Sequence, residues 1–145
     1  MTDDKIDIVP VCNATELSIP FIENTILAGF PSPAEDYLES GIDLNKELIR
    51  HPSTTFFGRV KGDSMCGAGI FEGDILVIDK SLDAKDDDIA VCFIDGEFTL
   101  KRIKREKDAV WLIPANDKYK PIRVTVDNDF LIWGIVTAVV RKIRH

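Results

Sequence analysis

Two side chains in this sequence have the types and the setting that acyl-transfer chemistry needs. Ser64 lies in a short polar turn, Gly62-Asp63-Ser64-Met65, and Lys101 lies in an apolar, strand-like segment at residues 97–103. A serine hydroxyl becomes a good nucleophile when a neighbouring base takes its proton, and a lysine amine can be that base when apolar surroundings favour its neutral form. The pair therefore predicts nucleophilic catalysis by a serine and a lysine, without a histidine triad.

Each of these residues also has an ordinary structural explanation. Glycine, aspartate and serine commonly form turns that carry no chemistry, and a lysine in a strand commonly extends its amine to water. Cys66 is a weaker candidate nucleophile, because no histidine stands near it in the sequence to activate it. The residue pattern alone leaves these explanations open.

The metal-binding residue types do not form a recognisable site. The two histidines, His51 and His145, are far apart in the sequence, and the three cysteines, Cys12, Cys66 and Cys92, include no pair in C-x-x-C spacing. We therefore expect no metal and no cofactor. Free cysteines of this kind are typical of a reducing cytosol.

Composition limits the class of protein. The 145 residues are 45% hydrophobic and 30% charged, with a net charge of −7, which is typical of one soluble globular domain. The negative charge argues against non-specific nucleic-acid binding as the main function. Two local basic runs, at residues 101–105 and 141–144, are expected to be solvated strand edges.

The sequence contains no recognisable signal peptide or membrane span. Its acidic start lacks the basic and apolar regions of a signal peptide. The longest apolar run, residues 130–140, is too short to cross a bilayer as a helix and is rich in β-branched residues. We expect a cytoplasmic protein.

From residue 54 onward the sequence predicts short strands bounded by turn residues. Asp95-Gly96 joins two apolar runs and indicates a tight hairpin, which places Lys101 on its second strand. The expected fold class is mainly β, an antiparallel and partly barrel-like domain. The expected strands cover residues 54–60, 74–79, 89–94, 97–103, 109–114, 122–126 and 130–140.

The N-terminal part has a different character. Residues 1 to about 30 show no regular period, so we expect an extended or partly ordered arm that docks on another surface. Short N-terminal helices are expected next. Ser32-Pro33-Ala34-Glu35 has the residues of a helix start, and Gly41 would end that helix. Asp43 is expected to cap a second short helix that runs through Ile49.

Several motifs, in this order, resemble the LexA/UmuD family of self-cleaving Ser/Lys peptidases, and UmuD proteins most closely. The resemblance runs from about residue 28 to residue 140, and it implies a LexA/UmuD-type peptidase domain. The motifs are the turn at residues 62–65, the segments 28–34, 43–45 and 51–53, the strand 73–79, the hairpin 95–101 and the segment 112–116.

The resemblance assigns a role to five residues. It implies that the scissile bond is the one between Ala28 and Gly29, that Ser64 attacks the Ala28 carbonyl, and that Lys101 takes the hydroxyl proton and returns it to the leaving amine. The backbone N–H groups of Asp63 and Ser64 are the expected oxyanion donors.

The resemblance also implies a domain division and a set of partners. Residues 1–28 are expected to be an arm that self-cleavage removes, and residues 29–145 a β domain that forms a homodimer. The expected helper is a RecA filament on single-stranded DNA, formed in the SOS response to DNA damage. The expected partner of the truncated dimer is a UmuC-like catalytic subunit of an error-prone, translesion Y-family DNA polymerase.

Three other functions remain open at this stage. One is a transcriptional repressor of the LexA or phage type, although only a short acidic segment precedes residue 28 and no sequence-specific DNA binding is expected of it. Another is a peptidase that acts on other proteins, like a signal peptidase, but we expect no membrane anchor. The last is a binding module that keeps the fold without the catalysis.

Overall fold

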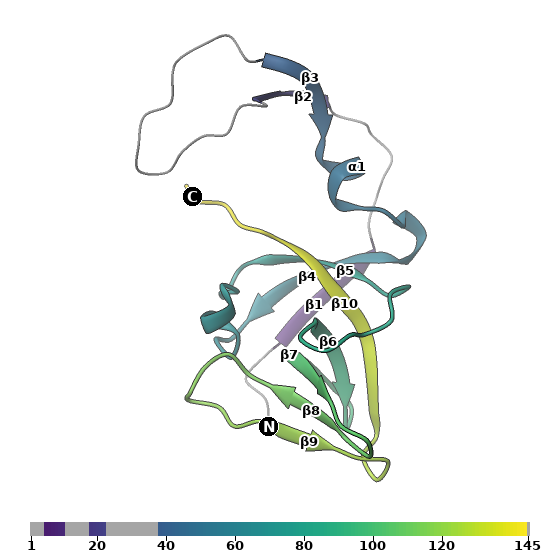
Figure 1. Ribbon diagram of the computed structural model, residues 1–145. Helices are drawn as coiled ribbons and strands as arrows, with labels where there is room; N and C mark the ends of the chain where they lie inside the picture. The colour runs from purple at the N-terminus through teal and green to yellow at the C-terminus, as the bar shows by residue number, and fades with distance from the viewer. Residues whose placement is uncertain (1–4, 11–17, 23–37, 145) are drawn as a thin grey trace. The chain divides into compact units, whose positions relative to one another are not determined.

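The computed structural model describes residues 5–10, 18–22 and 38–144 of the chain (Figure 1). The chain divides into two compact units. One combines Met1–Val11 with His51–His145, and the other is Cys12–Arg50. Each unit is considered by itself.

The first unit is an eight-stranded sheet in which every neighbouring pair of strands is antiparallel. The order across the sheet is β1-β4-β5-β10-β6-β7-β8-β9. The expected mainly β, antiparallel fold class is confirmed. The strands are β1 (Lys5–Pro10), β4 (Thr55–Lys61), β5 (Ile75–Asp79), β6 (Ile89–Ile94), β7 (Glu97–Arg105), β8 (Val110–Ile113), β9 (Ile122–Val124) and β10 (Phe130–Val140), and two 3-10 turns are η1 (Pro52–Thr54) and η2 (Cys66–Ala68).

The long strand β10 joins the two halves of this sheet. It pairs with β6 through its first part and with β5 through its last part, with a shift of register in each pairing. Figure 1 shows it running the full height of the β domain, beside β5 and β6. Position 134 of this strand suits glycine, because a Cβ there would stand 2.6 Å from a methyl carbon of Ile78.

The hairpin of β6 and β7 forms where the sequence predicts it. Asp95 and Gly96 both have positive φ, 47° and 86°, as a two-residue turn of type I′ requires. The turn fixes the register of the two strands, so that Lys101 of β7 lies opposite Ala90 of β6. A local sequence signal thus places the candidate base.

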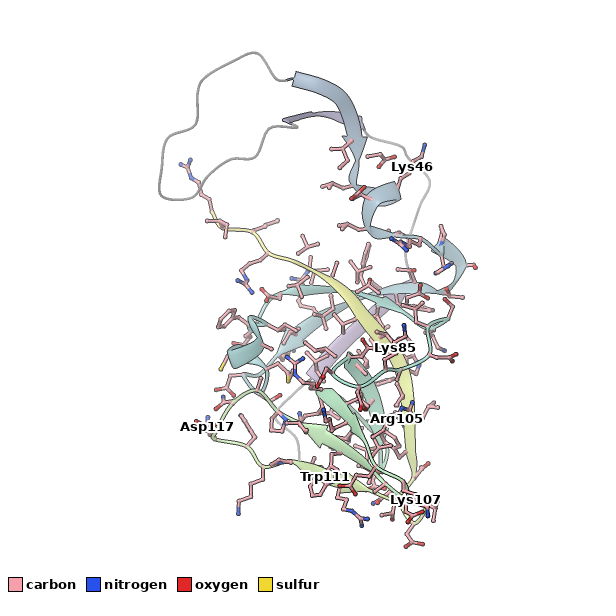
Figure 2. The ribbon with its side chains drawn as sticks, in the orientation of Figure 1. Lys46, Lys85, Arg105, Lys107, Trp111 and Asp117 are labelled. Carbon is pink, nitrogen blue, oxygen red and sulfur yellow. The ribbon has the colours of Figure 1, made fainter. Side chains whose placement is uncertain are left out.

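The basic run at residues 101–105 does not form a sheet edge, and that expectation was wrong. Strand β7 lies between β6 and β8. Lys101 points inward, where 3% of the residue is exposed, whereas Lys104, on the opposite face, and Arg105, the last residue of the strand, are exposed. Figure 2 shows the side chain of Arg105 at the surface of the β domain.

The second unit contains β2 (Ser18–Ile22), β3 (Leu38–Asp43) and α1 (Leu44–Leu48). Asp43 caps α1 as predicted, because its carboxylate accepts a hydrogen bond from the Asn45 N–H at 3.0 Å. The prediction of a helix that ends at Gly41 is wrong over residues 38–41, which belong to strand β3 and pair with β2. Pairing with a distant strand overrides the local helix signals there, and residues 32–37 lie outside the described ranges.

Part of the expected N-terminal arm has regular structure. Residues 5–10 are extended, as expected, and they dock as β1 on the edge of β4, with Ile6 opposite Val60 and Ile8 opposite Gly58. The domain division at residue 28 depends on the cleavage prediction and stays a prediction. Within the ranges the structure describes, no helix has the length and apolar character that crossing a bilayer takes.

Candidate active site

Ser64 is held in a tight turn between β4 and η2. Gly62 has φ of 101°, a conformation that glycine adopts without strain, and it reverses the chain at the end of β4. The turn carries Ser64 into the interior, where 1% of the residue is exposed. Met65 is also buried and packs in the core beside Leu76 and Leu100.

Lys101 extends its amine to the same point from β7. Its Nζ lies 3.2 Å from Ser64 Oγ, 2.9 Å from Thr99 Oγ1 and 3.0 Å from the Leu100 carbonyl oxygen. Thr99 is two residues before Lys101 on the same strand, so both side chains lie on one face of it. The structure therefore brings the two residues predicted from the sequence within hydrogen-bonding distance, although a strand lysine commonly reaches water.

This arrangement can move a proton between the two residues. An ammonium at Nζ donates to all three oxygen atoms, whereas a neutral amine that donates to Thr99 and Leu100 can receive the hydroxyl proton of Ser64 on its lone pair. Burial of both groups excludes water from the nucleophile. These are the conditions for a serine activated by an amine base.

A loop between β8 and β9 clamps the turn that carries Ser64. The Ala115 N–H donates to the Ser64 carbonyl at 2.7 Å, and the Gly67 N–H donates to the Ala115 carbonyl at 2.7 Å. The side-chain amide of Asn116 donates to the Asp63 carbonyl at 2.9 Å, and the hydroxyl of Tyr119 donates to Asp63 Oδ1 at 2.6 Å. The nucleophile is thus fixed on both sides by residues from another part of the chain.

The turn and the clamping loop approach each other so closely that side-chain size matters. A Cβ on Gly67 would stand 2.5 Å from the Ala115 carbonyl oxygen, which is backbone and cannot move aside at low cost.

The hydrogen bond from Tyr119, the largest influence, lowers the pKa of Asp63, and the charge of Lys118 acts in the same direction. Asp63 therefore stays an acceptor for Tyr119 at neutral pH.

Sequence reasoning missed Tyr119 as part of this site. Ala115 and Asn116 belong to a segment that resembles the peptidase family, but no local signal links a tyrosine to a turn so distant in the chain. The oxyanion role of the Asp63 and Ser64 N–H groups stays a prediction. The expected scissile pair, Ala28 and Gly29, lies outside the described residues.

The other candidate groups are placed differently. Cys66 is partly exposed and Cys92 is buried. Burial raises the pKa of the Cys92 thiol to about 12, against the opposing effect of the positive charge of Lys101, so this thiol is unreactive at neutral pH. Among the residues that the structure describes, no group of three histidine, cysteine or acidic side chains could hold a metal ion.

Another cluster, of a serine, a histidine and an aspartate, lies at the start of the β domain. His51 Nδ1 lies 2.6 Å from Asp79 Oδ2, and Ser81 Oγ lies 3.3 Å from that same Nδ1 and 2.7 Å from Asp79 Oδ1. In a catalytic triad the serine and the carboxylate contact opposite ring nitrogens of the histidine. Here they share one nitrogen, so the cluster has the geometry of a structural network.

Comparison with known proteins assigns a family. Residues 20–137 match the family described as Peptidase S24-like. Protein MucA of Salmonella typhimurium is 42% identical over 135 residues, which are 92% of each chain. Protein SamA of Salmonella typhimurium strain LT2 is 39% identical over 137 residues, or 94% of this chain and 95% of SamA. LexA repressor 1 of Geobacter sulfurreducens is 38% identical over 131 residues, or 90% of this chain and 64% of the repressor.

Proposed function

This chain belongs to the S24-like peptidase family, among its UmuD-like members, and from that membership we propose that it is a serine peptidase that cleaves its own backbone. The observation that carries the proposal is the 3.2 Å contact between Lys101 Nζ and Ser64 Oγ. Both residues are buried in a turn and a strand that the fold holds rigidly, as a preorganised catalytic pair requires.

The proposed reaction has two steps. Ser64 Oγ attacks the carbonyl carbon of Ala28 as its proton passes to Lys101 Nζ, and the N–H groups of Asp63 and Ser64 hold the oxyanion. The C–N bond then breaks, Lys101 gives the proton to the amine of Gly29, and Ala28 remains as an ester on Ser64. Water, losing a proton to Lys101, then attacks the ester carbonyl. The C–O bond to Ser64 Oγ breaks, Lys101 returns the proton to Oγ, and the Ala28 carboxylate leaves.

The proposed biological setting is the SOS response to DNA damage. A RecA filament on single-stranded DNA would stimulate the cut in the cytoplasm, which removes residues 1–28. The remaining residues 29–145 would form a homodimer that serves as the accessory subunit of a UmuC-like, error-prone translesion polymerase. This part of the proposal rests on membership of the family.

The direct test follows the mass of the purified chain with and without activated RecA. We expect a fragment that begins at Gly29, and no such fragment from Ser64→Ala or from Lys101→Ala. Two matched variants should cleave like the parent: Ser81→Ala, which removes another hydroxyl, and Lys104→Ala, which removes an exposed amine from the same strand. A Ser64→Ala chain that cleaves at the parental rate would overturn the peptidase assignment.

The pH dependence of cleavage tests the amine base. A general base acts in its unprotonated form, and an amine gains that form as the pH rises. We therefore expect cleavage without RecA to accelerate from neutral to alkaline pH, until the fold itself fails. A rate that stays constant over this range would reject Lys101 as the base.

A repressor is the second candidate, favoured by the similarity to LexA repressor 1. A gel-shift with damage-inducible promoter fragments separates the two functions. Sequence-specific binding by this chain alone would favour the repressor, and its absence together with self-cleavage would favour the proposed peptidase.

A further inference from the structure

We propose that cleavage opens a docking site for a partner strand on the edge of β4, the edge that β1 covers in the intact chain. The inference rests on the proposed function for the cut itself, because residues 5–10 belong to the segment that the cut at Ala28 detaches. The partner would be a protein that supplies an extended strand antiparallel to β4, in the place of β1.

The pairing of β1 with β4 defines the site. β1 is the outermost strand of the sheet, and β4 has β5 as its other neighbour. The two strands pair over the whole of β1, from Lys5 opposite Lys61 to Pro10 opposite Phe56. Without β1, the N–H and C=O groups of β4 on that side lose their partners, and an open edge of this kind pairs readily with another strand.

The inner face of β1 also covers part of the core. Ile8 packs against the cluster of buried residues that includes Val60, Met65 and Leu100. β1 lies close to β7 as well, the strand that carries Lys101. Loss of β1 therefore exposes apolar surface together with the open edge, and this favours replacement by another strand over an unoccupied edge.

The cut would weaken the binding of β1 to the β4 edge by making β1 part of a separate molecule. Cleavage after Ala28 breaks no contact between β1 and β4, because the strand ends at Pro10. It does convert an intramolecular pairing into an intermolecular one, and so removes the effective concentration that the covalent connection supplies. A single six-residue strand has little affinity of its own at micromolar concentrations, so the detached arm should dissociate.

The register of β1 indicates which strand fits. Asp7 is the register partner of Arg59, and Ile8 is the partner of Gly58. Arg59 is exposed, and its guanidinium contacts the Gly73 carbonyl at 3.5 Å. The expected partner strand therefore has an acidic residue opposite Arg59 and, next to it, a branched aliphatic residue that fills the place of Ile8.

The experiment makes the cut without using Ser64. A site for a sequence-specific protease is placed within residues 12–17 of the Ser64→Ala chain, and the protein is cut, passed through size exclusion and analysed by amide hydrogen exchange. We expect the arm to separate and the amides of β4 to exchange at least about tenfold faster than in the uncut chain. A synthetic peptide of residues 4–11, added at about millimolar concentration to replace the lost effective concentration, should restore the protection of the cut protein and should not bind the uncut one.

A matched pair of peptides tests the inner position. Ile8→Thr and Val9→Thr both keep a β-branched residue, but Ile8 packs on the core whereas Val9 is 53% exposed. Only the Ile8→Thr peptide should lose its binding. Equal binding of the two peptides would overturn the proposed fit.

Three other results would contradict the proposal. They are an arm that stays bound after the cut, an open β4 edge that the peptide does not protect, and a cut protein that unfolds. Association of cut chains with one another, reversed by the peptide, would assign the edge to a second copy and overturn the proposed partner. Because an added protease makes the cut, a chain that never cleaves itself refutes the proposed function and leaves this test intact.

Discussion

The hydroxyl of Tyr119 donates a hydrogen bond to Oδ1 of Asp63 across 2.6 Å, and Asp63 is the residue immediately before the candidate nucleophile. The tyrosine belongs to the loop between β8 and β9, and the aspartate to the turn that follows β4. Asn116 of the same loop holds the Asp63 carbonyl. The position of the Ser64 backbone therefore depends on the register of the distant β8 strand.

Removal of the Tyr119 hydroxyl should slow self-cleavage without unfolding the protein. Tyr119→Phe keeps the ring but loses the bond to Asp63, and a small displacement of a nucleophile is enough to reduce the rate by about tenfold. Cleavage rate and labelling of Ser64 by a fluorophosphonate probe should fall together. Lys118→Ala is the comparison, because its 3.7 Å ion pair with Asp63 is exposed and should contribute little. Parental rates in Tyr119→Phe would show that the clamp does not position the serine.

The hydroxyl of Thr99 should matter through the orientation of the Lys101 amine. Thr99 is fully buried, and its Oγ1 lies 2.9 Å from Nζ. Thr99→Val keeps the shape but deprives the amine of one acceptor, so we expect cleavage to slow by about tenfold. Thr99→Ser keeps the hydroxyl and should retain most of the rate, which single-turnover cleavage assays measure. Equal rates for the two variants would remove Thr99 from the positioning of the base.

The sequence predicts those parts of the site that local patterns govern. The Asp95-Gly96 turn determines the β6–β7 hairpin and its register, which places Lys101 opposite Ala90. Gly62 before Ser64 marks the reversal that carries the serine. Each of these features depends on residues that are close together in the chain, so their types alone are informative.

Long-range pairing accounts for what the sequence did not predict. Leu38 to Gly41 carry a helix-ending signal, yet they form strand β3 because β2 lies alongside. The basic run after Lys101 resembles an edge strand, but β8 covers it. Tyr119 contacts the turn that contains Asp63, which lies 56 residues earlier in the chain. In each case the structure of a segment depends on its contact with a segment that is distant in the sequence. The local residue types therefore do not predict it.

The network around Asp79 should make the stability of the β domain sensitive to acid. Burial favours a higher pKa for Asp79, but hydrogen bonds from His51, Ser81 and Thr54 outweigh it and lower the pKa from 3.8 to about 2. The unfolded chain therefore binds this proton more readily than the folded one. Asp79 stabilises the fold fully above pH of about 4, and this contribution is lost as the pH falls toward 2.

Urea denaturation over a pH series measures this effect. At neutral pH, Asp79→Asn should lower the free energy of unfolding by about 2 kcal/mol, the equivalent of the pKa shift, and the difference from the parent should shrink below pH of about 4. Asp108→Asn changes an exposed carboxylate and should have little effect at any pH. A difference that stays constant down to pH of about 2 would contradict the assignment to Asp79.

The end of β10 should depend on a bidentate ion pair. Arg141 donates to both oxygens of the Asp74 carboxylate at 2.6 Å, with Nε to Oδ1 and Nη2 to Oδ2, and donates to the Gly69 carbonyl at 2.7 Å. Its guanidinium also lies 4.7 Å from the ring centroid of Phe71. The hydrogen bond from Arg141 lowers the pKa of Asp74, so the buried aspartate is charged at neutral pH and needs this partner.

Removal of the Arg141 guanidinium should therefore lower the free energy of unfolding by more than an ordinary surface substitution does. Arg141→Met leaves the Asp74 charge buried without its bidentate partner and should lower the free energy of unfolding by about 3 kcal/mol, measured by urea denaturation of the full chain. Arg141→Lys restores the charge but not the planar fork, so we expect only partial recovery. The adjacent Lys142→Met removes an exposed cation and should be nearly neutral. Asp74→Asn in the Arg141→Met background should recover stability, because the double variant buries no charge, and a double variant less stable than Arg141→Met would refute this account of the pair.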